Sequence, residues 1–196
     1  RAADLALLLA VGVALLAPPV ATVSLAVCAA LAVLYSHPRT AWKAHPVLGP
    51  AVNVIGYGLL TPLAGWAAAA VAPTPRLPLV LVCTAAAMAA LTFVAQVFQG
   101  EEDGARGDRT LVVTHGPGTC IRVARAGFAL AGGLVFAQAA AGWLPRVLLL
   151  AVPVGLALSA QLGRWSRAPL VGGPAQARLT FRWLVALGLA LVGLAL

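Results

Sequence analysis

Long apolar runs, separated by short polar segments, set the strictest limit on how this chain folds. Seven such runs lie at about residues 2–17, 20–36, 48–71, 77–97, 119–142, 145–163 and 177–196. A helix needs roughly 20 residues to cross a bilayer. Lipid offers no hydrogen bond to backbone N–H and C=O groups, so strands with open edges are excluded. A closed membrane barrel is excluded as well, because its alternating pattern does not occur in the sequence. We therefore expect an all-α fold, a polytopic membrane helical bundle with seven transmembrane helices.

The composition agrees with one transmembrane domain over residues 1–196. Only 9% of the residues are charged and 62% are hydrophobic, whereas soluble domains carry roughly 25% charged residues. The net charge of +8 does not indicate a nucleic-acid partner, because the arginines lie between apolar runs, where they set orientation. Cys28, Cys83 and Cys120 lack the spacing of metal ligands and are expected to be small core residues.

Basic residues are distributed unevenly between the two sides of the expected bundle. Pro- or Gly-rich turns join three pairs of runs, and the longer connections are 37–47, 98–118 and 164–176. Of the 13 lysines and arginines, only Arg76 and Arg146 fall on the side of the short turns. Because an excess of Lys and Arg marks the cytoplasmic side, we expect the long connections there. The high Arg and Ala content is typical of GC-rich genomes, so we expect the inner membrane of a bacterium.

Four of the five carboxylates of the chain lie close together, at Glu101, Glu102, Asp103 and Asp108. If the preceding helix continues to its end, Gln96, Gln99 and Asp103 share one face, with Glu102 three residues after Gln99. Amide and carboxylate oxygens suit Mg²⁺. The candidate metal ligands are Gln96, Gln99, Glu101, Glu102 and Asp103. The glycines expected to turn the backbone after the helix are Gly100, Gly104 and Gly107. The alternatives are a solvated loop and, for the two glutamines, interhelical hydrogen bonds.

Cationic side chains on the same side are suited to an anion that the metal also binds. Guanidinium groups match phosphate oxygens with two parallel hydrogen bonds, and Lys43, the only lysine, would act as a point charge. The candidate diphosphate ligands are Arg39, Lys43, Arg106 and Arg109. The alternative for the two in the 37–47 connection is orientation at the lipid headgroups, with Tyr35 and Trp42 as interfacial aromatics.

Two polar residues lie one helical turn apart inside the third apolar run. Asn53 and Tyr57 share a face of the expected helix near its cytoplasmic end. They would line a cavity within the bundle. The alternative is an interhelical hydrogen bond, worth under ~1–2 kcal/mol in a membrane.

Three segments occur in a recognisable order along the chain. They are Tyr35-Ser36-x-Pro38-Arg39 followed by Lys43, then Asn53-x-x-Gly56-Tyr57-Gly58, and then Glu101-x-Asp103-x-x-x-Gly107-x-x-Thr110-Leu111. Together they resemble the UbiA superfamily of intramembrane prenyltransferases, over most of the chain. The resemblance implies a ring of helices, usually nine, around a central cavity open to the membrane. It also implies Mg²⁺-dependent transfer of an isoprenyl group from an isoprenyl diphosphate to an aromatic or other lipophilic acceptor.

The resemblance also implies roles for individual residues. Metal-side ligands would be Glu101, Glu102 and Asp103. Contacts to the diphosphate would come from Arg39, Lys43, Arg106 and Arg109. Asn53 and Tyr57 would face the cavity near the reacting carbon, as catalytic residues. Asp108 would serve the metal or pair with a neighbouring arginine.

The chain departs from the family pattern in two respects. Gln96 and Gln99 stand where many members have aspartates, as in a similar branch of the family, and amides bring no charge to a metal. The first Asp-rich motif is absent, since Asp4 is the only acid before Gln96. We therefore expect the runs to match helices three to nine of a longer enzyme that has two further N-terminal helices, so that this chain alone is incomplete for catalysis. The alternative function is a non-catalytic membrane transporter or assembly subunit that binds a polyprenyl lipid.

Overall fold

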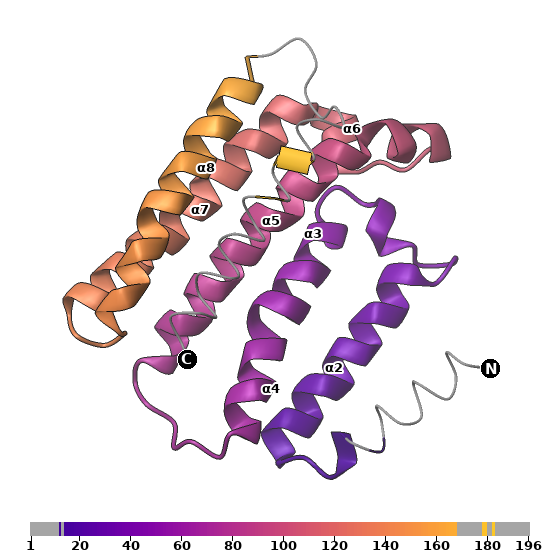
Figure 1. Ribbon diagram of the computed structural model, residues 1–196. Helices are drawn as coiled ribbons and strands as arrows, with labels where there is room; N and C mark the ends of the chain where they lie inside the picture. The colour runs from indigo at the N-terminus through magenta and orange to yellow at the C-terminus, as the bar shows by residue number, and fades with distance from the viewer. Residues whose placement is uncertain (1–11, 13, 168–177, 180–181, 183–196) are drawn as a thin grey trace.

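The structure is a computed structural model that describes residues 12, 14–167, 178–179 and 182. Over these residues it contains helices and no strands, which confirms the all-α expectation (Figure 1). Four helical segments in this part are long and apolar enough to cross a membrane: Pro19–Ser36, Leu48–Ala68, Leu77–Arg106 and Pro117–Ala140. The runs expected at 2–17 and 177–196 lie largely outside the described residues. Seven crossings, a closed ring and a single domain therefore stay predictions.

The observed helices follow the apolar runs closely. Helix α2 spans Pro19–Ser36, and α3 (Leu48–Asn53), the π-helix η2 (Val54–Leu60) and α4 (Thr61–Ala68) form one continuous segment. The remaining long helices are α5 (Leu77–Arg106), α7 (Pro117–Ala140) and α8 (Ala151–Trp165). Short helices are η1 (Trp42–Ala44), α6 (Leu111–His115) and η3 (Arg146–Leu150). Proline lies in the first turn of α2, α5 and α7, where its fixed φ and missing N–H are tolerated. Pro62 lies inside the continuous segment, directly after the π-helical turn.

Helix α5 continues further than the sequence indicated. It passes through Gly100 and Gly104, where we expected the backbone to turn, and ends at Arg106. The turn is made by Gly107 alone, which adopts the left-handed conformation with φ 77°. Arg106 forms ion pairs with carboxylates one helical turn before it, and such pairs stabilise a helix end. Most of the acidic segment is therefore helix rather than a solvated loop.

Small residues let α5 approach its neighbours closely on two sides. A Cβ added to Gly58 of η2 would lie 2.8 Å from the Cα of Ala85, and one added to Gly127 of α7 would lie 2.8 Å from the carbonyl oxygen of Ala86. The Thr84 hydroxyl donates a hydrogen bond of 2.6 Å to the Gly58 carbonyl. Close backbone contact and such hydrogen bonds replace the hydrophobic driving force that lipid does not supply.

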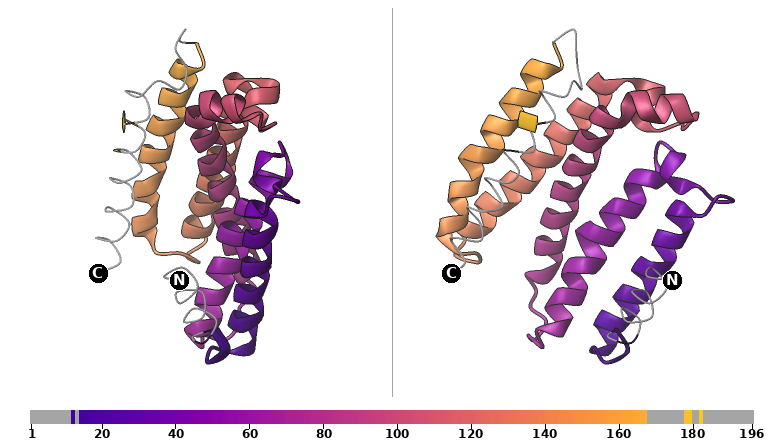
Figure 2. Two further views of the ribbon diagram at one scale, coloured as in Figure 1. Left: turned by 90° about the vertical axis from the view of Figure 1, so that its right-hand side faces the viewer. Right: turned by 45° about the vertical axis from the view of Figure 1, so that its right-hand side comes forward.

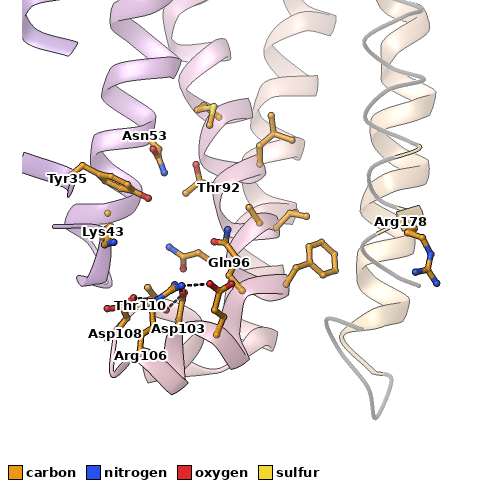
Figure 3. A pocket seen from close by; sticks show the side chains of 18 of the residues that line it. Tyr35, Lys43, Asn53, Thr92, Gln96, Asp103, Arg106, Asp108, Thr110 and Arg178 are labelled. Carbon is orange, nitrogen blue, oxygen red and sulfur yellow. Dashed lines mark hydrogen bonds and ion pairs between the residues drawn. The ribbon is translucent and has the colours of Figure 1, made fainter. Parts of the chain in front are cut away.

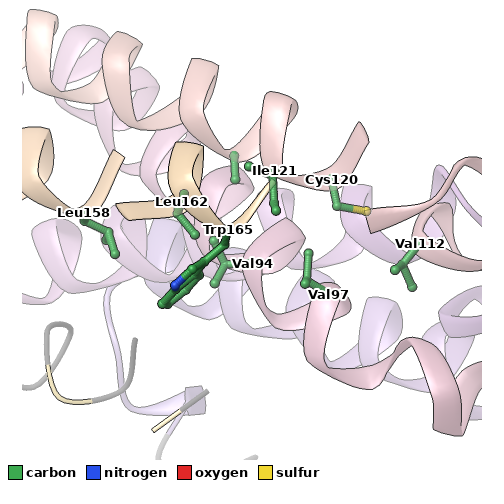
Figure 4. Packing of buried hydrophobic residues seen from close by; sticks show 9 residues of the cluster. Val94, Val97, Val112, Cys120, Ile121, Leu158, Leu162 and Trp165 are labelled. Carbon is green, nitrogen blue, oxygen red and sulfur yellow. The ribbon is translucent and has the colours of Figure 1, made fainter. Parts of the chain in front are cut away.

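The long helices lie side by side in chain order, with α5 in the middle of the row (Figures 1 and 2). The largest cluster of buried side chains joins α5 to α6, α7 and α8 (Figure 4). Its members are Val94, Val97, Val112, Cys120, Ile121, Ala124, Leu158, Leu162 and Trp165. Phe98 of α5 meets Trp165 edge to face, with ring centroids 6.4 Å apart. This cluster fixes one side of α5 and leaves another side free to face a cavity.

The two ends of the row are fastened by different contacts. At one end, where the short turns lie, Arg76 stacks on the ring of Trp143, with its guanidinium carbon 5.2 Å from the ring centroid. At the other end, the backbone N–H of Arg109 donates a hydrogen bond of 2.9 Å to the Ala44 carbonyl. This second contact joins the connection after α2 to the connection after α5 (Figure 1).

The close contact at Gly127 gives a test of the packing. Gly127→Ala is expected to lower the midpoint temperature of thermal unfolding in detergent. The new methyl group collides with the backbone of Ala86, which cannot move aside as a side chain can. Overpacking of this kind costs roughly 1–3 kcal/mol. Gly133→Ala, on the same helix with no atom within 4 Å, is the matched control. Its midpoint should stay equal or rise, since alanine favours a helix over glycine. Equal effects of the two changes would contradict the packing described.

Candidate functional site

A cavity of about 940 Å³ lies at the end of the row where α2 and α5 terminate (Figure 3). Its walls come from the end of α2, from η1 and α3, from the second half of α5 and from the segment after α5. The inner wall includes apolar side chains of α5, among them Met88, Leu91 and Phe98. Charged side chains gather at the rim. The cavity therefore offers one charged region and one apolar region to the same ligand.

Arg106 at the end of α5 binds three carboxylates of the rim. Its Nη2 lies 2.5 Å from Asp103 Oδ1, its Nε lies 3.2 Å from Asp108 Oδ2, and its Nη1 donates to Glu102 Oε1. The Asp103 side chain is only 6% exposed, whereas that of Arg106 is 47% exposed. Three carboxylates share one guanidinium, so the cluster keeps more negative than positive charge.

The buried carboxylate of Asp103 is held from a second direction by Thr110. The Thr110 hydroxyl donates a hydrogen bond of 3.0 Å to Asp103 Oδ2, and Thr110 itself is 4% exposed. Thr110 stands at the N-cap of α6, but its hydroxyl makes no capping hydrogen bond there. The left-handed Gly107 turns the chain back toward α5. The backbone N–H of Asp108 then donates a hydrogen bond of 2.9 Å to the Asp103 carbonyl. Both oxygens of Asp103 are therefore fixed in position.

Lys43 reaches the same cavity from the other connection. It belongs to η1, lines the cavity and lies above Asp108 and Thr110 in the view of Figure 3. Gly49 lets α3 begin close under it, because a Cβ on Gly49 would lie 3.0 Å from the Lys43 carbonyl oxygen. The 2.9 Å hydrogen bond from Arg109 to Ala44 fixes the two connections together. Residues 60 positions apart in the chain thus meet at one site.

The structure brings most of the expected site residues to this cavity. Those that line it are Lys43, Asn53, Gln96, Gln99, Glu102, Asp103 and Arg106. Gln96 is buried, at 7% exposure, and its Oε1 lies 4.0 Å from the Cys120 sulfur on α7. The interhelical contact that was the alternative for Gln96 is therefore present, although it is weak. The same residue also lines the cavity.

Four expected site residues do not line the cavity: Arg39, Tyr57, Glu101 and Arg109. Glu101 is exposed because α5 stays helical, which turns position 101 away from the face that carries Gln99 and Asp103. Tyr57 is 65% exposed. It lies in η2, where the wider π-helical turn changes the rotation per residue, so the α-helical spacing from Asn53 does not hold. The expectation that Tyr57 faces the cavity beside Asn53 is corrected accordingly.

Arg39 and Arg109 are exposed for local reasons. Arg39 lies in the turn after α2, where its backbone N–H donates a hydrogen bond of 3.2 Å to Nδ1 of His37. Arg109 uses its backbone N–H to join Ala44. The cationic groups that the described part of the chain places on the cavity wall are instead Lys43, Arg106, Arg178 and Arg182.

Several lining residues were not singled out by sequence reasoning. Arg178 and Arg182 line the cavity, and Arg178 lies on the far side from Lys43 (Figure 3). Their spacing of four residues was a usable signal, because it puts both on one helical face. Tyr35 lines the cavity as well, although we interpreted it only as an interfacial aromatic. Thr92 carried no signal, since a lone threonine in an apolar run is common.

The rim offers ligands that suit Mg²⁺, but they are arranged around Arg106. Gln99, Glu102 and Asp103 line the cavity, and such hard oxygen donors are what Mg²⁺ prefers. Within the described ranges, no three His, Cys, Asp or Glu side chains are placed to hold one ion. The donor chemistry therefore fits Mg²⁺, while the guanidinium of Arg106 provides the counter-charge in this arrangement.

Comparison with known proteins agrees with this architecture. The model of the UbiA prenyltransferase family matches residues 2–185, whereas no curated protein and no solved structure matches the chain. The match spans nearly the whole sequence and includes every segment that forms the cavity. An integral membrane bundle of helices with an acidic and basic rim is consistent with that family. The chain belongs to the UbiA prenyltransferase family.

Proposed function

We propose that the protein transfers an isoprenyl group from an isoprenyl diphosphate to a lipophilic acceptor within the membrane, with Mg²⁺ as cofactor. Membership of the family indicates a membrane prenyltransferase. The observation that carries the finer proposal is the cavity itself, whose rim combines Lys43, Arg106 and a carboxylate cluster beside an apolar wall. An isoprenyl diphosphate has the same division into a charged head and a hydrocarbon tail.

The charges of the rim support binding of a metal together with a diphosphate. Glu102, Asp103 and Asp108 share the single guanidinium of Arg106, so the cluster still attracts a cation. We assign Gln99, Glu102 and Asp103 as the metal-holding side chains. When bound there, Mg²⁺ would neutralise charge on the leaving diphosphate. Lys43 and Arg106 would bind the diphosphate oxygens where negative charge develops.

The apolar wall has a separate task in this proposal. Met88, Leu91 and Phe98 would contact the isoprenyl chain and keep water away from the allylic carbon. Exclusion of water matters because a cationic centre is captured by the first nucleophile that reaches it. Asn53, half-buried in the wall, lies where a neutral side chain would orient an acceptor.

We further propose that the end carrying the cavity faces the cytoplasm. The connections after α2 and after α5 meet at this end, and most of the lysines and arginines of the sequence belong to it. The positive-inside rule supports this orientation. A cytoplasmic rim would receive a soluble diphosphate head and Mg²⁺ directly from water.

The function can be tested by diphosphate release from the full-length protein in lipid nanodiscs, with geranylgeranyl diphosphate, a lipophilic phenol and Mg²⁺. Asp103→Asn is expected to lower the rate by about 10–100-fold, the range for groups that support a metal. Glu101→Gln should lower it by no more than about threefold, because Glu101 lies off the cavity. Chelation of Mg²⁺ should abolish release, and readdition should restore it. Tight binding of the diphosphate with no release would instead favour a non-catalytic lipid-binding protein.

Thr110 provides a second test. Within the described residues, Asp103 is the one acid of the rim to which its hydroxyl donates a hydrogen bond. Thr110→Val should weaken Mg²⁺ activation about tenfold, since Asp103 loses one of the two groups that orient it. Thr110→Ser keeps the hydroxyl and should restore most of the affinity. Thr114→Val is the matched control, because the Thr114 hydroxyl bonds only to backbone carbonyls and to the neighbouring His115. The same loss in Thr114→Val would show that α6 stability, not Asp103, is responsible.

A further inference from the structure

Thr92 of α5 has a buried hydroxyl that finds no partner within the described chain. The residue is 6% exposed, its Oγ1 has no hydrogen-bond partner among the described residues, and it lies on the cavity wall. Buried hydroxyls are nearly always hydrogen-bonded. On the wall of a cavity, a hydroxyl left unpaired by the described residues is suited to bond a polar group of a ligand.

Thr84, two helical turns earlier on the same helix, behaves differently. Its hydroxyl donates to backbone carbonyls, at 3.2 Å to Val80, 3.0 Å to Leu81 and 2.6 Å to Gly58. Bonding to the preceding turn is the usual way in which a helical threonine satisfies its hydroxyl. Thr92 does not use this arrangement.

The groups around Thr92 are polar but uncharged. Gln96 follows one turn later on α5, and Asn53 and Tyr35 line the cavity from α3 and from the end of α2. In Figure 3 the side chains of Tyr35, Asn53 and Thr92 gather around one part of the cavity, away from the Asp103 and Arg106 cluster. Hydroxyl and amide groups both donate and accept hydrogen bonds. They suit a neutral oxygen, whereas a diphosphate requires the charges of the rim.

The spacing along α5 separates the neutral and charged groups. Thr92, Gln96, Gln99 and Asp103 follow at intervals of four, three and four residues, so they form one stripe on the cavity side. At 1.5 Å per residue, Thr92 lies about 16 Å along the axis from Asp103. A ligand bound at Thr92 would therefore leave room for a diphosphate at the rim.

We propose that Tyr35, Asn53, Thr92 and Gln96 form a binding site for a neutral hydroxyl or carbonyl oxygen of the acceptor. The site selects acceptors that carry such an oxygen on a lipophilic body over pure hydrocarbons. This inference rests on the proposed prenyl transfer, because it assigns the acceptor end of the same cavity.

The test compares two probes of similar shape, 1-naphthol and 1-methylnaphthalene, by equilibrium dialysis against the protein in lipid nanodiscs. Mg²⁺ and the non-reactive thiolodiphosphate analogue of geranyl diphosphate are present throughout. Thr92→Val removes the hydroxyl and keeps the side-chain shape. It should raise the Kd of 1-naphthol about five- to tenfold, as expected for one lost hydrogen bond, and leave the Kd of 1-methylnaphthalene unchanged. Thr92→Ser should restore 1-naphthol binding, and Thr114→Val, outside the cavity, should alter neither.

Two results would overturn the site. One is an equal loss of both probes in Thr92→Val, which would reflect packing alone. The other is no change in 1-naphthol binding, which would mean that water satisfies the hydroxyl. The thiolodiphosphate is measured separately and should bind equally well to the wild type and Thr92→Val. Its failure to bind the wild type would overturn the proposed function, whereas the naphthalene pair decides on the acceptor site.

Discussion

The interaction on which this site depends is the one between Arg106 and the buried carboxylate of Asp103. A carboxylate withdrawn from water is costly unless it is paired and hydrogen-bonded. Asp103 meets both conditions, through Arg106 at 2.5 Å and Thr110 at 3.0 Å. The pair with Arg106 lies in the last turn of α5, and the hydrogen bond from Thr110 holds the chain after Gly107 against the helix.

Helix α5 serves a different partner on each of its sides. Small residues place it against η2 and α7, with backbones close enough that a methyl group on Gly58 or Gly127 would collide. The cluster around Ile121 and Leu158 fixes it to α7 and α8. Only the remaining side carries polar groups into the cavity. Packing on the other sides of α5 thus fixes the polar stripe that this helix presents to the cavity, opposite the residues that α2, η1 and α3 contribute.

Much of this fold and site could be predicted from the sequence, and the exceptions have physical causes. Apolar length located the helices described, since lipid permits little else, and the family pattern found the acids and Lys43. Tyr57 was misplaced because a π-helical turn leaves no mark in residue spacing, and Glu101 because ion pairs carry α5 through two glycines. Thr92 could not be found, because the sequence does not show that its buried hydroxyl has no hydrogen-bond partner among the described residues.

The stripe on α5 also limits how the protein can vary. Because Thr92 and Asp103 lie on one helix, loop movement does not change the distance between the neutral and the charged part of the cavity. Insertion of one residue between Thr92 and Asp103 would rotate the two ends by about 100° relative to each other. A change in the size of the cavity that keeps this spacing therefore has to come from the opposite wall, to which α2 and α3 contribute.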